Sequence, residues 1–319
     1  MCYSAQIIAD YRKYTKLYGA DIDIKEFARL FWERQQGSKA KVPKALAAPF
    51  LDAHTDEERR IKELIAEFDA DQAAQFEQDL FKQRARLADA NRTLQIKTTK
   101  AATESRRIAT GKIDWAIGKL ADLRRTDLKD RDSRIFPGQY APVMVMEHGR
   151  RVIKPMRYQC RPAGKPAFYD VKYPGTYNAR RDNLGGFWKG LFGYTHGLIV
   201  VNAFYENVNR HRVEHRELAE GEAVENVVLE FKPNPPQDML VACLWSHWQG
   251  KAEPDLLSFA AITDDPPPEI TLAGHDRCII PIKPEHIDAW LNPDPQHLAD
   301  QIAILDDPNQ PHYDYRQAA

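Results

Sequence analysis

Cysteine is scarce in this 319-residue chain, and its four cysteines form no CxxC pair. This spacing excludes a disulfide framework and a zinc knuckle as the basis of the fold. Apolar runs are short as well: none reaches the ~20 residues of a membrane span, and no basic segment followed by an apolar stretch opens the chain. We therefore expect a cytoplasmic protein with no membrane partner and no metal or other cofactor.

The net charge is close to zero, because 45 Lys and Arg residues are balanced by 46 Asp and Glu residues. A balanced total does not exclude nucleic-acid binding, since a local basic stripe is enough for that purpose. The chain is long enough to bury a large core, and 43% of its residues are hydrophobic. The length allows one large domain or two ordinary ones.

Proline is missing between Pro49 and Pro137. Thr55 followed by Glu58 three residues later is a capping-box pattern, and apolar residues then recur at helical spacing. This pattern predicts long amphipathic helices over about 55–125, arranged as a helical hairpin.

A further helix is expected from Ile24, because Phe27, Leu30 and Phe31 share one helical face. A predominantly helical region over residues 21–130 is therefore expected. Two roles remain open for it: an arm that grips DNA or an unidentified protein partner, or a charge-laced insertion packed on the main body.

Short apolar segments separated by proline-rich connections follow after residue 132. The expected strands cover residues 141–146, 197–202, 227–231, 239–245, 257–263 and 278–282. Such strands, with helices added, predict an α+β fold with a mostly antiparallel β body.

Basic and aromatic residues alternate between residues 150 and 181, and Arg157 and Tyr177 are among them. This pattern suits single-stranded DNA, where cations follow phosphates and rings stack on bases. A solvated surface with its aromatic side chains turned inward explains the same pattern equally well.

Met1-Cys2 opens the chain. Methionine before a small residue is normally trimmed, which would leave Cys2 with a free α-amine beside its thiol. Both groups have reference pKa values near ~8, so a useful fraction of each is nucleophilic at neutral pH. Together they can condense with an aldehyde to an imine and then to a thiazolidine ring.

Short motifs follow in a fixed order. They are Met1-Cys2, Asn178-Ala179-Arg180 with Asp182 nearby, Phe204-Tyr205-Glu206, Ala242-Cys243-Leu244-Trp245, a strand ending in Thr263, and His275-Asp276-Arg277. In this order the chain resembles the SRAP-domain family of abasic-site processing proteins, also called SOS response-associated peptidases. The resemblance covers Cys2 to about residue 20 and about 134–291. It implies a single SRAP-like domain over residues 1–319, in which residues 21–130 are a predominantly helical insertion. The chain departs from the family pattern at Tyr3-Ser4-Ala5, Asn207, Cys243 and Cys278, which bears on DNA stacking and substrate range.

The resemblance implies a covalent trap for the aldehyde of abasic sites in single-stranded DNA, with Cys2 as the reacting residue. Glu206 is suited to shuttle the protons of ring opening and dehydration. His275 is expected to titrate near neutrality and to assist that step. Asn178 could orient the amine, and Arg180 and Arg277 could clamp phosphates.

Three rival functions remain. Cys2 with Glu206 and His275 could perform acyl chemistry as an N-terminal cysteine peptidase or autopeptidase. His211 and His215 fit an H-x-x-E-H zinc motif if they share a helix face. Finally, the protein could be a non-covalent scaffold that binds damaged single-stranded DNA.

Overall fold

The computed structural model describes residues 3–250 and 253–318. Its residues form two compact units. The larger unit, here called the body, comprises the chain up to Leu30, Lys39–Asp52 and the chain from Lys129 onward. The smaller, here called the hairpin unit, comprises Phe31–Ser38 and Ala53–Leu128.

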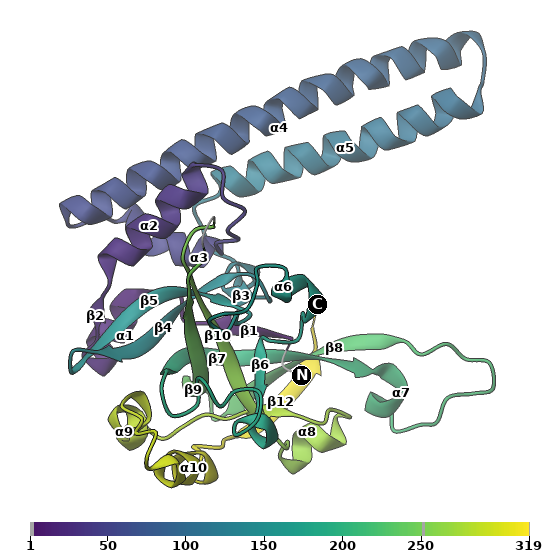
Figure 1. Cartoon of the computed structure of the whole chain (residues 1–319). Helices are drawn as coiled ribbons and strands as arrows, with labels where there is room; N and C mark the ends of the chain where they lie inside the picture. Colours follow the sequence, from purple (N-terminus) through teal and green to yellow (C-terminus); the bar gives the residue numbers. More distant parts are fainter. Residues whose placement is uncertain (1–2, 251–252, 319) are drawn as a thin grey trace. The chain divides into compact units, whose positions relative to one another are not determined.

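The body is built on a 12-stranded sheet in which most neighbouring strands are antiparallel (Figure 1). Its strands are β1 (Ser4–Ile7), β2 (Asp21–Ile22), β3 (Arg134–Ile135), β4 (Tyr140–Glu147), β5 (Arg150–Tyr158), β6 (Asn178–Arg180), β7 (His196–Asn209), β8 (Asn226–Asn234), β9 (Met239–Trp248), β10 (Leu256–Asp264), β11 (Cys278–Ile279) and β12 (His312–Gln317). Five of the six expected strands lie within β4, β7, β8, β9 and β10. Only two residues of the sixth, in β11, are in a strand. The α+β class with a mostly antiparallel body is confirmed.

Five strands of this sheet close on themselves. β10 pairs with β5, β5 with β4, β4 with β7, β7 with β9, and β9 again with β10. The β5–β10 pairing is parallel and joins Tyr158 to Phe259, whose rings stack at a centroid distance of 5.2 Å. Both residues are buried in the main hydrophobic core. Alternating side chains of the closed strands therefore fill a common interior.

Strand β7 is 14 residues long and extends past the closed ring. Its second half pairs on one side with β1, where Ser4 lies opposite Tyr205, and on the other with β8, where Leu229 lies opposite Glu206. β12 in turn covers the outer edge of β8. The start of the described chain is thereby fixed beside the end of β7.

Helices of the body are mostly short. They are α1 (Tyr11–Tyr18), α3 (Lys44–Ala47), α6 (Tyr169–Lys172), α7 (Arg210–Val213), α8 (Pro268–Leu272), α9 (Ile287–Leu291) and α10 (Leu298–Asp306), while α2 (Ile24–Gln35) has residues in both units. Trp290 of α9 stacks on His196 at the start of β7 with a ring distance of 4.0 Å. The His196 ring lies between the Trp290 and Phe192 rings and is buried.

The hairpin unit consists mainly of two long antiparallel helices, α4 (Asp56–Ile96) and α5 (Lys100–Arg124) (Figure 1). The expected hairpin is confirmed, and so is its capping box: Thr55 Oγ1 accepts from the Glu58 N–H while the Glu58 carboxylate accepts from the Thr55 N–H. Alanines at positions 102, 109 and 116 of α5 are buried at seven-residue spacing. Small side chains at this seam let the two helices approach closely. In the described part of the chain, no helix is both long and apolar enough to cross a membrane.

Candidate functional site

A carboxylate is buried near the end of β7. Phe204, Glu206 and Val208 alternate along the strand and therefore share one face, and Phe204 and Val208 belong to the hydrophobic core. The Glu206 side chain is 0% exposed, and its Oε2 lies 3.2 Å from Nε2 of His275. Because burying an isolated carboxylate is costly, contact with a proton-carrying partner stabilises Glu206 in this position.

His275 is placed by a tight turn at the end of α8. Gly274 has a φ of +90°, and a Cβ at this residue would lie 2.8 Å from the Arg212 Cβ and 3.0 Å from a Val208 methyl. Glycine is therefore required on both conformational and steric grounds. The turn brings the His275 N–H to the Ile270 carbonyl at 3.1 Å and directs the ring toward β7.

The protonation of His275 differs from the sequence-based expectation. Burial of the ring lowers its pKa to about 4, so titration near neutrality was the wrong prediction and the ring is neutral at pH 7. Nδ1 lies 2.9 Å from the Arg277 carbonyl and 3.3 Å from the Arg277 N–H. The ring Nε2 lies 3.2 Å from the Glu206 Oε2, close enough for a proton to pass between the two groups. This pair can therefore give up or take back a single proton.

Asn178 and Arg180 stand two residues apart on β6 and so face the same side of the sheet. Their neighbours on β10 are Ala261 and Thr263. Asn178 is buried, and its Oδ1 accepts from the Tyr158 hydroxyl at 3.4 Å. The Arg180 side chain is exposed and pairs with Asp182 at 3.0 Å, an ion pair weak enough for a phosphate to replace.

Two of the residues expected to bind DNA are buried. Arg277 is 8% exposed, and so is Tyr177, whose ring packs edge-on against Tyr158. Tyr177 thus fits the inward-facing alternative for the basic and aromatic stretch. The structure does not bring Arg277 or Tyr177 to the surface beside Arg180.

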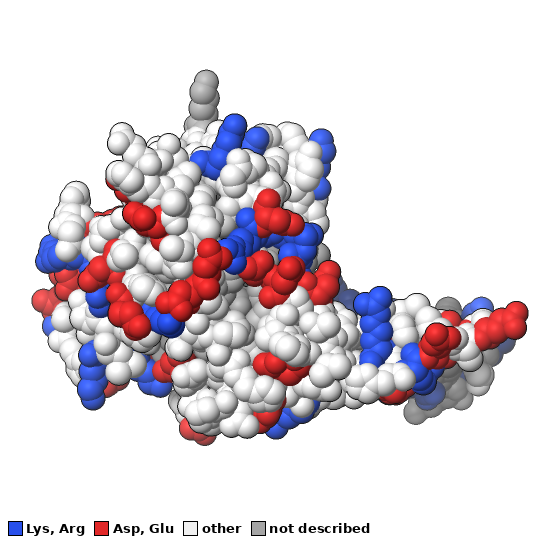
Figure 2. Space-filling model, turned by 90° about the horizontal axis from the view of Figure 1, so that it is seen from below, with Lys and Arg blue, Asp and Glu red and all other residues white. Residues whose placement is uncertain are grey.

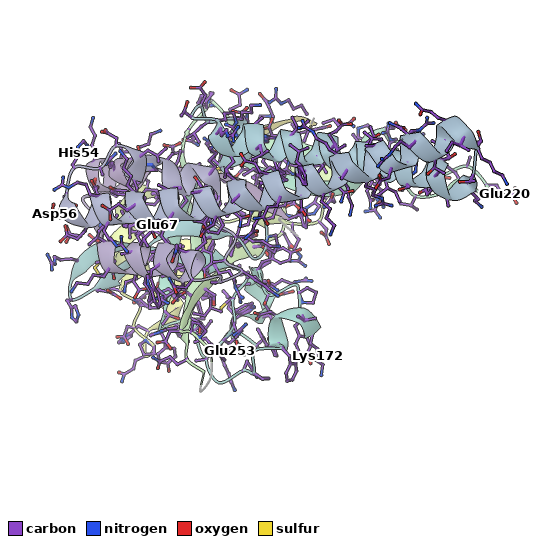
Figure 3. The ribbon with its side chains drawn as sticks, turned by 90° about the horizontal axis from the view of Figure 1, so that it is seen from above. His54, Asp56, Glu67, Lys172, Glu220 and Glu253 are labelled. Atoms are coloured by element: carbon purple, nitrogen blue, oxygen red, sulfur yellow. The ribbon has the colours of Figure 1, made fainter. Side chains whose placement is uncertain are left out.

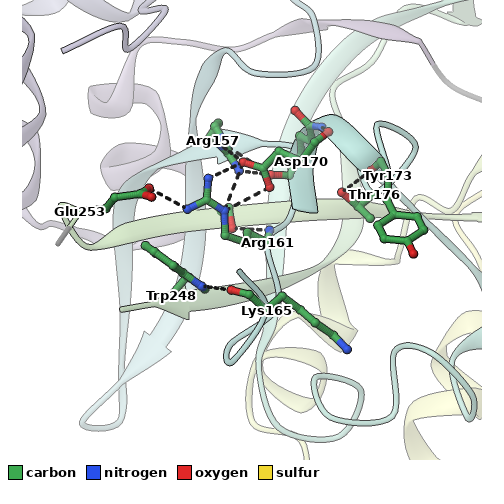
Figure 4. Close-up of polar contacts among 10 residues, drawn as sticks. Arg157, Arg161, Lys165, Asp170, Tyr173, Thr176, Trp248 and Glu253 are labelled. Carbon is green, nitrogen blue, oxygen red and sulfur yellow. Dashed lines mark hydrogen bonds and ion pairs between the residues drawn. The ribbon is translucent and has the colours of Figure 1, made fainter. Parts of the chain in front are cut away.

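Arg157 belongs to a polar network that also contains Arg161 and Asp170 (Figure 4). Asp170 accepts from Arg157 at 2.8 Å and from Arg161 at 2.5 Å, and Arg161 also lies over the Trp248 ring at 4.4 Å. Burial raises the pKa of Asp170, but the hydrogen bonds from the two arginines outweigh burial and the pKa is lowered overall. Arg157 therefore positions α6 and its flanking loop, a role that the sequence did not suggest.

The segment held by this network presents aromatic rings to solvent. Phe168 is 62% exposed and Tyr173 is 44% exposed, while Tyr169 stacks on Phe187 with an angle of 10° between the rings. Sequence reasoning missed Phe168 and Phe187. The only signal in the sequence was that these two residues lie within or near the basic and aromatic stretch. The exposure of a single side chain cannot be inferred from so short a segment.

Most other cations of the stretch are neutralised within the body. Their partners are Asp21 for Arg150, Asp288 for Arg151, Asp23 and Glu147 for Lys154, and Asp264 and Asp306 for Arg181. On the face shown in Figure 2, acidic side chains lie next to basic ones. Nucleic-acid binding by residues 150–181 would depend on a few residues rather than on a broad basic stripe.

The H-x-x-E-H segment does not form the helical face that a zinc site of this kind needs. α7 ends at Val213, and His215 lies beyond it with a φ of +50°. Among the described residues, no group of three or more His, Cys, Asp and Glu side chains is arranged to hold a metal ion. The zinc alternative therefore lacks the shared helix face on which it depends.

Three of the four cysteines are buried in the body. Burial raises the pKa of Cys160 and of Cys278 to about 12, and that of Cys243 well above its usual value. These thiols are protonated at neutral pH and shielded from substrates. Cys2, the predicted nucleophile, lies outside the described residues.

A model of the SRAP family, described as SOS response associated peptidase, matches residues 92–317. This match spans more than half of the chain. The chain belongs to the SRAP family. The matched region includes β4 to β12 with Asn178, Glu206 and His275, and the expected family is thereby confirmed. Met1-Cys2 lies outside the matched region.

Three of the solved structures to which this SRAP protein is similar carry bacterial names. One is a protein from Bordetella bronchiseptica with 16% identity, a TM-score of 0.46, and coverage of 59% of this chain and 87% of its own. A second, from Bacteroides thetaiotaomicron, has 14% identity, a TM-score of 0.46, and coverage of 59% and 78%. A phage-related protein from Bordetella bronchiseptica has 18% identity, a TM-score of 0.42, and coverage of 58% and 81%. No curated protein sequence matches the chain.

Proposed function

We propose that this SRAP protein traps the aldehyde of abasic sites in single-stranded DNA as a covalent adduct of Cys2. The observation that carries the proposal is the buried Glu206–His275 pair, in which Oε2 and Nε2 are 3.2 Å apart. The pair lies at the end of β7 that is paired to β1. Ser4 begins β1, and Cys2 is only two residues before it, a covalent span of at most ~7.6 Å between Cα atoms.

The chemistry needs a nucleophilic thiol and an amine on neighbouring carbons. Cys160, Cys243 and Cys278 cannot supply them, since they are buried within the chain and carry raised thiol pKa values. Cys2, freed by removal of Met1, has both groups. Its amine attacks the sugar C1′ aldehyde to give a carbinolamine, which loses water to form an imine. Addition of the thiol to the imine carbon, with its proton passing to nitrogen, closes a thiazolidine.

Glu206 and His275 serve the proton transfers of this sequence. Opening the closed sugar and expelling water both need a group that donates a proton and takes it back, and the adjacent carboxyl and imidazole groups are suited to this role. The same transfers in reverse would release the adduct slowly. Asn178, with its amide held by Tyr158, would orient the amine or the sugar oxygen.

DNA binding would use the exposed features near β6. Arg180 is free to exchange Asp182 for a phosphate, and the rings of Phe168 and Tyr173 offer faces on which bases can stack. Arg277 is buried beside His275, so we assign it to holding the turn. Its carbonyl and N–H both contact the His275 ring.

The test mixes the purified protein, with Met1 removed, with a single-stranded oligonucleotide carrying one abasic site. Denaturing electrophoresis and intact mass should show a species equal to protein plus oligonucleotide minus one water. Cys2→Ala should abolish it, whereas Cys160→Ala, which removes a buried thiol of raised pKa, should leave the yield unchanged. A full yield from Cys2→Ala would refute the mechanism.

Other outcomes separate the rival functions. Binding without any covalent species would favour a non-covalent scaffold for damaged single-stranded DNA. Cys2-dependent cleavage of peptides without an adduct would favour the peptidase activity that the family description names.

A further inference from the structure

The two ends of the α4–α5 hairpin carry opposite charge. Residues 56–79 hold nine acidic and three basic side chains, whereas residues 80–113 hold nine basic and two acidic ones. The second segment therefore has a net charge of +7, in a chain whose total is -1. It is continuous in space as well as in sequence, because the Arg86 Nε donates to the Ser105 Oγ across the two helices at 2.9 Å. We call residues 80–113 the basic half of the hairpin.

Most of this positive charge is not neutralised locally. Only Arg92 and Arg107 form ion pairs, with Asp89 and Glu104, and all four of these side chains are exposed. Six other cations are exposed and, among the described residues, make neither an ion pair nor a side-chain hydrogen bond: Lys82, Arg84, Lys97, Lys100, Arg106 and Lys112. The acidic end differs, since Arg59 and Arg60 there pair with Asp56 and Glu63. Seen from above in Figure 3, side chains project on all sides of α4 and α5, and Asp56 and Glu67 mark the acidic part of α4.

We propose that the basic half of the hairpin binds the phosphate backbone of duplex nucleic acid without reading its sequence. Seven net positive charges on a segment about 25 Å long match the dense negative charge of a duplex. The one aromatic residue of this segment is Phe81, at its edge next to the acidic end, and none occurs between positions 82 and 113. The segment therefore lacks the series of rings on which successive unpaired bases stack. Two packed helices are also wider than the ~12 Å major groove, which favours contact along the backbone over insertion. The inference is independent of the chemistry proposed for Cys2.

The experiment measures binding of the full-length protein to a fluorescent 20-base-pair DNA duplex without abasic sites, by anisotropy over a series of salt concentrations. The variant carries Lys97→Gln, Lys100→Gln, Arg106→Gln and Lys112→Gln. The matched control, Arg59→Gln, Arg60→Gln, Lys62→Gln and Lys119→Gln, removes the same charge from the other half of the hairpin. Helix content by circular dichroism verifies that both variants fold.

We expect the variant to bind at least tenfold more weakly at low salt, and the slope of log affinity against log salt to fall by about 2 to 4, since each lost phosphate contact contributes ~0.9. The control should stay within threefold of the parent protein. Equal losses in both variants, or none in either, would overturn the proposal. If self-association by sedimentation is lost in the variant while duplex affinity persists, the surface binds a second copy and the proposal fails.

The adduct assay separates this proposal from the proposed function. A short single-stranded oligonucleotide with an abasic site should react with the quadruple variant as with the parent protein. Absence of an adduct in both proteins would refute the Cys2 chemistry and leave the duplex measurement decisive for the hairpin.

Discussion

Glu206 and His275 lie close enough for a proton to pass between them, with Oε2 and Nε2 3.2 Å apart. Because burial lowers the pKa of His275 to about 4, the ring is neutral at pH 7 and would hold a second proton only briefly. The pair is thus built for transfer and not for steady electrostatic attraction.

Replacing Glu206 by glutamine removes the transfer while keeping the shape and a hydrogen bond to His275. We expect Glu206→Gln to slow adduct formation by about 100-fold, within the range typical of a lost general acid or base. Affinity for single-stranded DNA should change less than twofold. Time courses on denaturing gels measure the rate, and anisotropy measures the affinity.

Glu230→Gln is the matched control for this prediction. Glu230 is also a buried carboxylate of the body, but it is bonded to Tyr205 and Arg316 and has no assigned part in the reaction. Similar slowing by both variants would mean that packing, and not proton transfer, explains the effect.

The buried ring of His196 leads to a second prediction, on how the free energy of unfolding depends on pH. Its Nε2 accepts from the Gly193 N–H at 2.8 Å, so Nδ1 carries the proton and donates to the Trp290 carbonyl. Burial lowers its pKa to about 3, below the ~6.5 of an unfolded chain. Between these pH values the unfolded state binds more protons than the folded state. The stability that neutral His196 contributes is therefore fully present above pH ~6.5 and is lost as the pH falls toward the folded pKa. The free energy of unfolding should decrease by about 2 kcal/mol from this residue between pH 7.5 and 5.

Urea unfolding at the two pH values tests the sign and the size of this decrease. His196→Gln has no titrating ring, and its pH dependence should be smaller by about the same 2 kcal/mol. An identical pH dependence in the two proteins would assign the acid sensitivity to other groups.

Single residues were predictable where a motif fixed their identity, but not their surroundings. The short motifs selected Glu206 and His275, which the structure brings into contact. They did not reveal that Tyr177 is buried or that Arg157 is bound to Asp170, because these depend on chain segments that meet only in the folded body.

At the scale of elements, the hairpin depends on a seam of small side chains. Ala109 is 0% exposed where α5 faces α4, so a leucine there must push the helices apart. Ala109→Leu should destabilise the hairpin by about 1–3 kcal/mol and increase amide exchange in α4 and α5.

Ala101→Leu provides the comparison, because Ala101 is exposed on the same helix and both substitutions replace alanine with another good helix former. It should change stability by less than about 0.5 kcal/mol. Equally fast amide exchange in both variants would show that crowding at the buried alanines does not explain the effect of Ala109→Leu.

Elements with strong local signals were the predictable ones. The absence of proline, the capping box and helical periodicity identified the hairpin, and the short apolar segments identified six of the twelve strands, one of them only in part. β12 was missed because its sequence, HYDYRQ, is polar and gains its strand structure from pairing with β8. Pairing of this kind is a tertiary effect that overrides local preference.

For the body as a whole, the seam between β5 and β10 completes the closed ring of strands. Phe259 is 0% exposed and stacks on Tyr158 across this seam. Phe259→Ala should lower the free energy of unfolding of the body by about 3–5 kcal/mol in chemical denaturation.

Phe168→Ala is the counterpart, since this ring is 62% exposed. It should change stability by less than about 0.5 kcal/mol but weaken binding to single-stranded DNA by about 1–3 kcal/mol if bases stack on it. A large stability loss with unchanged DNA affinity would contradict both expectations. Closure of the ring was not predictable from sequence, because it joins Tyr158 to a residue about a hundred positions away without any local signal.

The position of β1 has a consequence for the timing of synthesis. This strand pairs on one side with residues 134–135 and on the other with residues 201–205 of β7. At ~5–20 residues per second, the ribosome needs roughly 10–40 s after β1 emerges to deliver its last partner. During that interval the opening segment of the nascent chain is accessible to processing enzymes. Once β7 has emerged, β1 becomes a central strand that is held from both edges.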